Sequence, residues 1–220
     1  MEKFSFTSKP IVSIGLLCAA GIILLSLRIA VTGKSLFVFL LWNVLLAILP
    51  MLPAFHFKKR ATQGQVLWSI PLFIAWLLLF PNAPYLLTDF VHVHDRLLIP
   101  IWFDTALLFC FVLSGLLAGI LSLHWIHEGL NRFFSKPIAW FCIGFSILLS
   151  GYGIYLDRVL RFNSWDIIFN SKQLVLLSFF HLQNTQAMAM TITFSIVMAA
   201  VYGVFKISYT NSNHETFLHQ

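Results

Sequence analysis

The sequence predicts an all-α integral membrane bundle of about six transmembrane helices, with one further interfacial or re-entrant helix on the outer surface. The chain has 220 residues, of which 59% are hydrophobic and only 10% are charged, whereas soluble domains carry about 25% charged residues. Six spans of roughly 20 residues with short connections occupy nearly this whole length. We therefore expect a single membrane domain over residues 1–220, without a separate soluble domain.

Six apolar stretches define the predicted spans. They fall at residues 11–31, 36–55, 66–81, 101–123, 138–156 and 185–205. Thr32-Gly33-Lys34-Ser35 is a turn-forming cluster, so the first two spans should form an antiparallel hairpin. Pro50 and Pro53 are expected to kink or end the second span, because proline removes a helical hydrogen bond.

The third span is predicted to be broken. Its apolar run stops at Phe80, and the two prolines of Pro81-Asn82-Ala83-Pro84 cannot continue a regular helix. A broken helix at membrane depth is tolerated only where it is buried in protein or lines a wet cavity. An apolar pattern then resumes, with Asp89 and His92 on one face of a helical turn.

Two further segments interrupt the apolar pattern. His124, His127 and Glu128 follow the fourth span and precede Gly129, which predicts a solvated helix end with a glycine breaker. Residues 164–183 mix apolar with polar side chains and are too polar to span, so we interpret them as the interfacial or re-entrant helix. If this segment did span, the C-terminus would lie outside.

Lysine and arginine positions predict the orientation. With a cytoplasmic N-terminus, the inner side carries Lys3, Lys9, Lys58, Lys59, Arg60, Arg132, Lys136 and Lys206, and the outer side carries Lys34, Arg96, Arg158, Arg161 and Lys172. Arg28, near the outer end of the first span, is expected to snorkel outward. The inner excess predicts a multi-pass protein of the cytoplasmic membrane with both termini cytoplasmic.

Acidic residues, which did not enter this count, gather on the predicted outer side. All five aspartates lie there, namely Asp89, Asp95, Asp104, Asp157 and Asp166. Carboxylates near hydrocarbon are costly, so they usually have a partner or a task. The cluster therefore predicts an extracytoplasmic polar site.

Two groups within this cluster could carry chemistry. Asp89 and His92, with Asp104 from the next helix, suit a divalent metal, although no strong metal motif is present. The alternative is a hydrogen-bonded anchor in which Asp89 caps backbone amides. Arg158 and Arg161 could hold a lipid phosphate; the alternative is an internal ion-pair network in which Asp157, four residues from Arg161, is its partner.

Other functions have less support in the sequence. The formal charge is +6, but no basic run exceeds Lys58-Lys59-Arg60, so we expect no nucleic-acid partner. No nucleophile elbow, phosphate-binding loop or dinucleotide fingerprint is present. Cys18, Cys110 and Cys142 each lie in an apolar stretch and are interpreted as buried small hydrophobic residues.

Three segments resemble a known family. They are Phe80-Pro81-Asn82-Ala83-Pro84-Tyr85-Leu86-Leu87-Thr88-Asp89, then Trp102-Phe103-Asp104, then Arg158-Val159-Leu160-Arg161-Phe162-Asn163-Ser164-Trp165-Asp166. They are similar to the marked segments of an uncharacterised bacterial polytopic membrane-protein family, domain of unknown function 1361. The resemblance implies the fold and the location but no reaction. It points to Asn82, Tyr85, Asp89, Asp104, Arg158, Arg161, Asn163, Trp165 and Asp166.

Three hypotheses of function follow, and the sequence leaves them open. The first is an outward-facing polar site that binds or processes an anionic or lipid-linked ligand, with Asp89, Asp104 and Asp166 as catalytic candidates and a divalent metal as an optional cofactor. Its ligand-binding candidates are Asn82, Tyr85, Arg158, Arg161, Asn163 and Trp165, and its metal candidates are Asp89, His92 and Asp104. The second is a non-catalytic membrane scaffold or assembly subunit whose ion pairs are structural. The third is a small transporter. Enzyme activity, substrate and oligomeric state are not predicted.

Overall fold

The computed structural model of the chain describes residues 8–93, 99–162, 176–178 and 180–218. These residues fold into two compact units, Met1–Ser135 and Lys136–Gln220, which are described separately. The chain is 86% helical, and the described part contains no strand, so the predicted all-α class is confirmed. The single domain expected over residues 1–220 stays a prediction.

Among the described residues, six helices are long and apolar enough to cross a membrane, as predicted. They are Pro10–Thr32, Phe39–Thr62, Val66–His92, Ile101–Phe133, Lys136–Arg158 and Thr185–Tyr209. Each starts within about three residues of its predicted start, but four of them, at Thr62, His92, Phe133 and Tyr209, end about four or more residues later than predicted. The chain is therefore a multi-pass membrane protein, and its helices continue past the last strongly apolar residue.

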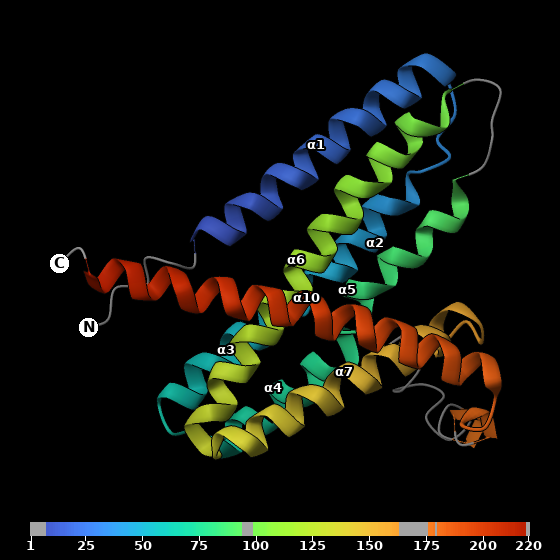
Figure 1. Ribbon diagram of the computed structural model, residues 1–220. Coiled ribbons are helices and arrows are strands. Elements are labelled where there is room, and N and C mark those ends of the chain that lie inside the picture. The colour runs from blue at the N-terminus through green and yellow to red at the C-terminus, as the bar shows by residue number, and fades with distance from the viewer. Residues whose placement is uncertain (1–7, 94–98, 163–175, 179, 219–220) are drawn as a thin grey trace. The chain divides into compact units, whose positions relative to one another are not determined.

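Helix α6 (Ile101–Phe133) is the central element of the first unit. Around it are α1 (Ser8–Thr32), α2 (Phe39–Ile48), α3 (Met51–Thr62), α5 (Asn82–Tyr85) and the 3₁₀ helix η1 (Leu86–His92), all of which contact α6, while α4 (Val66–Leu79) packs on α3. Figure 1 shows α1 and α2 beside the first half of α6, with α3 beside its second half. Helix α6 is the most buried of these six spans because the other helices of the first unit pack around it.

A narrow stripe of α1 faces α6. Its buried positions, Ile14, Gly21, Leu25 and Arg28, follow the three-, four- and seven-residue spacing of one helix face. A Cβ on Gly21 would come within 3.0 Å of the Phe111 ring, so the glycine permits close approach of the two helices. The rest of α1 is apolar and mostly exposed, as suits a helix that faces lipid.

The second span is interrupted at Pro50, as predicted. Helix α2 ends at Ile48, a turn follows at Leu49 and Pro50, and α3 begins at Met51. Pro53 lies in the first turn of α3, where its missing N–H breaks no helical bond. Consequently α3 continues through the basic residues to Thr62 instead of ending near residue 55.

The third span is interrupted near Phe80, as predicted: α4 ends at Leu79, a turn follows at Phe80 and Pro81, and α5 and η1 continue the span to His92. Pro84 has no N–H to give to the Phe80 carbonyl, so the Ala83 N–H donates to that carbonyl at 3.1 Å, a tighter 3₁₀ spacing. In an α-helix the Ala83 N–H would donate to the Leu79 carbonyl. Here that carbonyl accepts a 2.8 Å hydrogen bond from the Asn82 side chain instead. The prolines therefore end the regular α-helix, and the short helices α5 and η1 follow it.

The predicted solvated end of the fourth span is wrong. Helix α6 continues ten residues beyond position 123, and His124 and His127 are buried within it. Gly129 does not break the helix; a Cβ there would lie 2.5 Å from the Phe57 ring of α3. The glycine allows α3 to contact α6 closely. That contact buries His124 and His127, whose polarity had made this part of the sequence look like a helix end.

The two long helices described in the second unit are α7 (Lys136–Arg158) and α10 (Thr185–Leu218). They approach closely at Gly151, where a Cβ would lie 2.6 Å from the Thr191 carbonyl oxygen. The Ser195 hydroxyl donates across the pair to the Ile147 carbonyl at 3.3 Å. Small and hydroxyl residues of this kind are typical of helix interfaces in membranes. Most of the predicted interfacial segment 164–183 lies outside the described residues.

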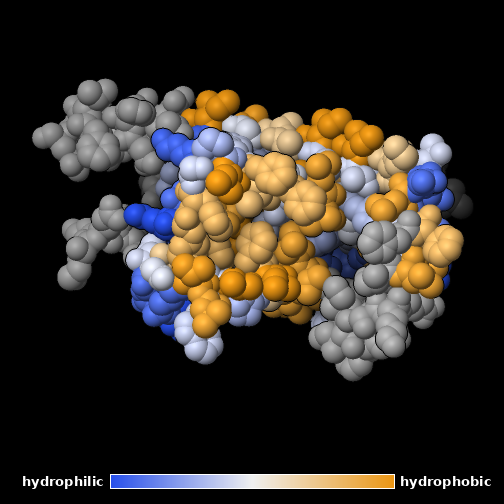
Figure 2. All heavy atoms as spheres, turned by 90° about the horizontal axis from the view of Figure 1, so that it is seen from below, coloured by the Kyte–Doolittle hydropathy of each residue, from blue (hydrophilic) through white to orange (hydrophobic). Residues whose placement is uncertain are grey.

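Exposed tryptophans mark the ends of the spans. Trp42, Trp68, Trp102 and Trp140 are all exposed, and each lies in the first five residues of its helix. Tryptophan is enriched at the two membrane–water interfaces. Hydrophobic residues cover the middle of the face seen in Figure 2, as suits helices that contact lipid tails.

Candidate functional site

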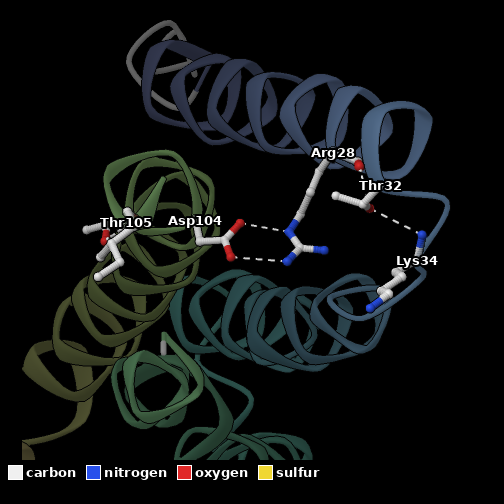
Figure 3. Close-up of polar contacts among 6 residues, drawn as sticks. Arg28, Thr32, Lys34, Asp104 and Thr105 are labelled. Atoms are coloured by element: carbon white, nitrogen blue, oxygen red, sulfur yellow. Dashed lines mark hydrogen bonds and ion pairs between the residues drawn. The ribbon is translucent and has the colours of Figure 1, made fainter. Parts of the chain in front are cut away.

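The clearest polar site lies at one end of the first unit, where α1 ends and α6 begins. Arg28 of α1 and Asp104 of α6 form a two-pronged ion pair, with Nε donating to Oδ1 at 2.7 Å and Nη2 donating to Oδ2 at 3.1 Å (Figure 3). The two residues are 4% and 2% exposed. A guanidinium that meets both carboxylate oxygens in this way is the strongest common form of protein ion pair.

The surroundings of Arg28 hold its side chain in place. The ring of Phe37, which is buried, lies 4.6 Å from the guanidinium carbon and supplies a cation–π contact. Thr32 donates to the Arg28 carbonyl at 2.7 Å and accepts from the Lys34 amide at 3.2 Å, so the end of α1 is closed by a side chain (Figure 3). The outward snorkelling expected for Arg28 is wrong, because a buried carboxylate on α6 attracts it inward.

Asp89 is the second buried carboxylate at this end. It lies in η1, is 0% exposed, and accepts a 2.8 Å hydrogen bond from the side-chain amide of Asn43 on α2. His92, one turn later, packs edge-to-face against Phe39 with ring centres 5.3 Å apart. Asp89 and Asp104 lie at the same end of the first unit, and each accepts from its own nitrogen donor; their shared site with the other aspartates stays a prediction.

Arg28 and Asn43 were not identified by sequence as site residues. Asn43 did carry a signal, since it is a lone amide in an apolar run, and buried amides need partners. Arg28 carried a similar signal as the one cation inside the first span. The partner of each could not be read from spacing, because the pairs join residues 46 and 76 positions apart.

The metal prediction for Asp89, His92 and Asp104 has no support in this geometry. Among residues 8–93, 99–162, 176–178 and 180–218, no group of three or more His, Cys, Asp or Glu side chains is arranged to hold a metal ion. The assignment stays a sequence prediction.

Two predicted ligand-binding residues have structural contacts. Asn82 donates to the Leu79 carbonyl, as described above, and the Tyr85 carbonyl accepts a 2.7 Å bond from the Thr88 hydroxyl. Both residues are half-buried beside the proline turn. These contacts stabilise the change from α4 to η1, and the ligand-binding role of Asn82 and Tyr85 stays a prediction.

The predicted basic group lies at the end of α7 in the second unit. Helix α7 ends at Arg158, and Arg161 follows it with a left-handed backbone, φ +60°. The helical spacing predicted for Arg158, Arg161 and Asp157 is therefore wrong, because Arg161 is not in the helix. Arg161 is exposed. Asn163, Trp165, Asp166 and Asp95 lie outside the described residues.

Two further polar contacts of the second unit were not predicted. The Tyr155 hydroxyl lies 2.8 Å from Nδ1 of His181, and the Tyr152 hydroxyl donates to the Ser178 carbonyl at 2.5 Å. Tyr155 is buried, so its hydroxyl needs such a partner. These bonds attach the residues before α10 to the last turns of α7.

The match to a known family covers more than half of the chain. A family model described as "Protein of unknown function (DUF1361)" matches residues 42–201. The chain belongs to the DUF1361 family. No curated protein and no solved structure matches it.

The DUF1361 match divides the polar site. It begins inside α2, so it includes Asn43, Asp89 and Asp104. Arg28, the partner of Asp104, lies on α1 and outside the matched residues. In this chain, the ion pair thus joins a helix outside the DUF1361 match to the central helix within it.

Proposed function

We propose that this protein is a non-catalytic membrane scaffold or assembly subunit, in which buried charges join helices at the extracytoplasmic end of the first unit. The observation that carries this proposal is the Arg28–Asp104 pair, in which both carboxylate oxygens accept from one guanidinium. A general base or a metal ligand needs an accessible lone pair at the reacting atom. Asp104 is nearly inaccessible and already occupied, which favours a structural role.

The orientation is part of the proposal. Six spans place both termini on the same side of the membrane, and the excess of Lys and Arg favours the cytoplasmic side of a cytoplasmic membrane. The Arg28–Asp104 end of the first unit would then face the extracytoplasmic side.

Replacement of both partners tests the structural role. Asp104→Leu alone should lower the amount of folded protein, because it leaves the Arg28 guanidinium buried without its partner. Arg28→Met with Asp104→Leu should restore the protein level and complement a deletion strain, because two apolar side chains suit this buried position. Thr105→Ala, at an exposed neighbour whose hydroxyl bonds within its own helix at 2.9 Å, is the matched control. A double variant that is folded and abundant but fails to complement would show that the charges act in chemistry or binding.

A second candidate function rests on Arg161. We propose as the alternative that the exposed end of α7 binds an anionic or lipid-linked ligand. A non-glycine residue in the left-handed region costs about 1 kcal/mol or more, and such residues cluster at ligand sites. Arg161→Gly keeps that backbone and removes the guanidinium, so it should abolish complementation at a normal protein level. Full activity of Arg161→Gly would contradict the alternative.

The transporter hypothesis has less support than the other two. The interruption of the third span favoured it, but Ala83 and Pro84 beside that interruption are buried and α5 contacts α2 and α6, which favours a structural role over the lining of a path.

A further inference from the structure

Exposed cations gather at the end of the first unit opposite the Arg28–Asp104 pair. This basic end consists of the last turn of α3, the last turn of α6 and the first turn of α4. Lys59 and Arg60 of α3 and Arg132 of α6 are exposed there. It is distinct from the polar site described above and from the proposed role of that site.

The packing of α3 on α6 brings these cations to the same end. Gly129 of α6 faces Phe57 and Ala61 of α3, and the Phe57 and Phe133 rings lie 6.3 Å apart. Arg132 is three residues from Gly129, so it projects from the same side of α6 as this contact. Arg60 is one residue from Ala61. The two arginines therefore emerge from neighbouring helix ends.

The acid that these helices carry at this end is already neutralised. Glu128 Oε2 lies 2.5 Å from Lys58 Nζ, and Glu128 Oε1 lies 3.5 Å from Nε2 of the buried His124. Residues 51–79 contain no Asp or Glu, and α6 has no acid beyond Glu128. The exposed side chains of these helix ends thus carry excess positive charge, which an external anion can balance.

The basic end lies at the depth of lipid headgroups. Arg60 donates to the Gln65 side chain at 2.7 Å, and Gln65 precedes α4, whose first turn carries Trp68 at 67% exposed. An exposed tryptophan at a span end sits at headgroup level. From Asp104 to Arg132, α6 rises about 42 Å, which exceeds the roughly 30 Å of the hydrocarbon core. Arg132 therefore lies beyond the hydrocarbon, where phosphate groups are found.

We propose that the basic end binds the phosphate groups of anionic phospholipids through Lys59, Arg60 and Arg132. Arginine forks match phosphate oxygens, and lysine adds a point charge. The exposed Trp68 beside them would rest among the upper acyl chains. The proposal holds for whichever leaflet this end faces.

Native mass spectrometry of the full-length protein in detergent tests this proposal. Phosphatidylglycerol should bind in preference to phosphatidylcholine. The affinity for phosphatidylglycerol should fall about fivefold for each cation removed. The variants are Arg60→Gln, Arg132→Gln, and a triple variant that combines these two with Lys59→Gln. Lys34→Gln, at the opposite end, should leave the preference unchanged. Added salt should weaken binding of phosphatidylglycerol to the unaltered protein, which provides a readout that needs no variant.

Three results would overturn the proposal. The first is that the two lipids bind equally. The second is that Arg132→Gln, with native helix content, keeps the full preference for phosphatidylglycerol. The third is that equimolar inorganic phosphate displaces phosphatidylglycerol. The last would indicate a site for a soluble anion instead of a lipid surface. Failure here would leave the scaffold proposal unaffected, because that proposal concerns buried residues at the other end.

Discussion

The two ends of the first unit use charge in opposite ways. At one end, Arg28 and Asp104 point inward from α1 and α6 and are almost inaccessible. At the other end, Lys59, Arg60 and Arg132 are exposed, and the acid of α6, Glu128, is held by Lys58. The same residue types therefore serve helix association at one end and contact with the surroundings at the other.

This difference has a physical cause in the depth of the residues. Arg28 lies one turn before the end of its span, so its charge needs a partner within the protein. Arg132 lies in the last turn of a helix that is longer than the hydrocarbon core, so water and headgroups can solvate it. Substitutions at the inward end should therefore affect stability, and those at the outward end should affect binding.

Asp104→Ala should have the largest effect. It leaves a buried guanidinium without its carboxylate, which costs about 3–5 kcal/mol in the free energy of unfolding. Denaturant titration of the protein in mixed micelles, followed by circular dichroism, measures this change. An effect no larger than that of Thr105→Ala would mean that the buried pair does not stabilise the first unit.

Asn43→Ala should have the next largest effect. It removes the donor to the buried Asp89 carboxylate, and a hydrogen bond to a charged group contributes about 1.5–3 kcal/mol. The same titration measures it, with Ser26→Ala as control, because Ser26 is exposed and its hydroxyl bonds within its own helix. Equal stability of the two variants would argue against a structural role for Asp89.

Gly129→Ala should destabilise the contact of α3 with α6. The new Cβ would lie 2.5 Å from the Phe57 ring, and overpacking of this kind costs about 1–3 kcal/mol. Gly15→Ala is the matched control, because a Cβ at Gly15 would meet no atom within 4 Å, and α1 should become slightly more stable. Thermal unfolding of both variants measures the difference. If Gly129→Ala were as stable as Gly15→Ala, the close contact of α3 with α6 would be contradicted.

Arg132→Gln should have the smallest effect on stability. The side chain is exposed at a helix end, so its thermal unfolding in neutral detergent should match that of the unaltered protein. A loss of stability as large as that of Asn43→Ala would show that Arg132 has an internal partner, and the two ends would then not differ as described.

Sequence predicted the spans well because hydrophobicity over about 20 residues is a strong signal. It failed where tertiary packing overrides composition. His124 and His127 read as solvated, but α3 covers this part of α6. For the prolines at positions 81 and 84, the end of the regular helix was predicted, but not the side-chain and 3₁₀ hydrogen bonds by which the span continues.

Two residues of the predicted site lie at one end of the first unit, and their partners were not predicted. Topology alone placed Asp89 and Asp104 at one membrane end, and the structure joins them to Asn43 and Arg28 at that end. The direction of the Arg28 side chain depends on which helix packs beside α1, and local spacing contains no such information. A continuous helix would have placed Arg161 one turn after Arg158. Helix α7 ends at Arg158 instead, and Arg161 has a left-handed backbone outside the helix.

A double-mutant cycle on Arg28→Met and Asp104→Leu tests the central claim most directly. If the pair is a structural link between α1 and α6, each single variant should be strongly destabilised, and the double variant should recover most of that loss. The interaction energy should be about 2–3 kcal/mol. Single costs that add to within about 0.5 kcal/mol would contradict the account, since they would show that the two buried charges do not stabilise each other.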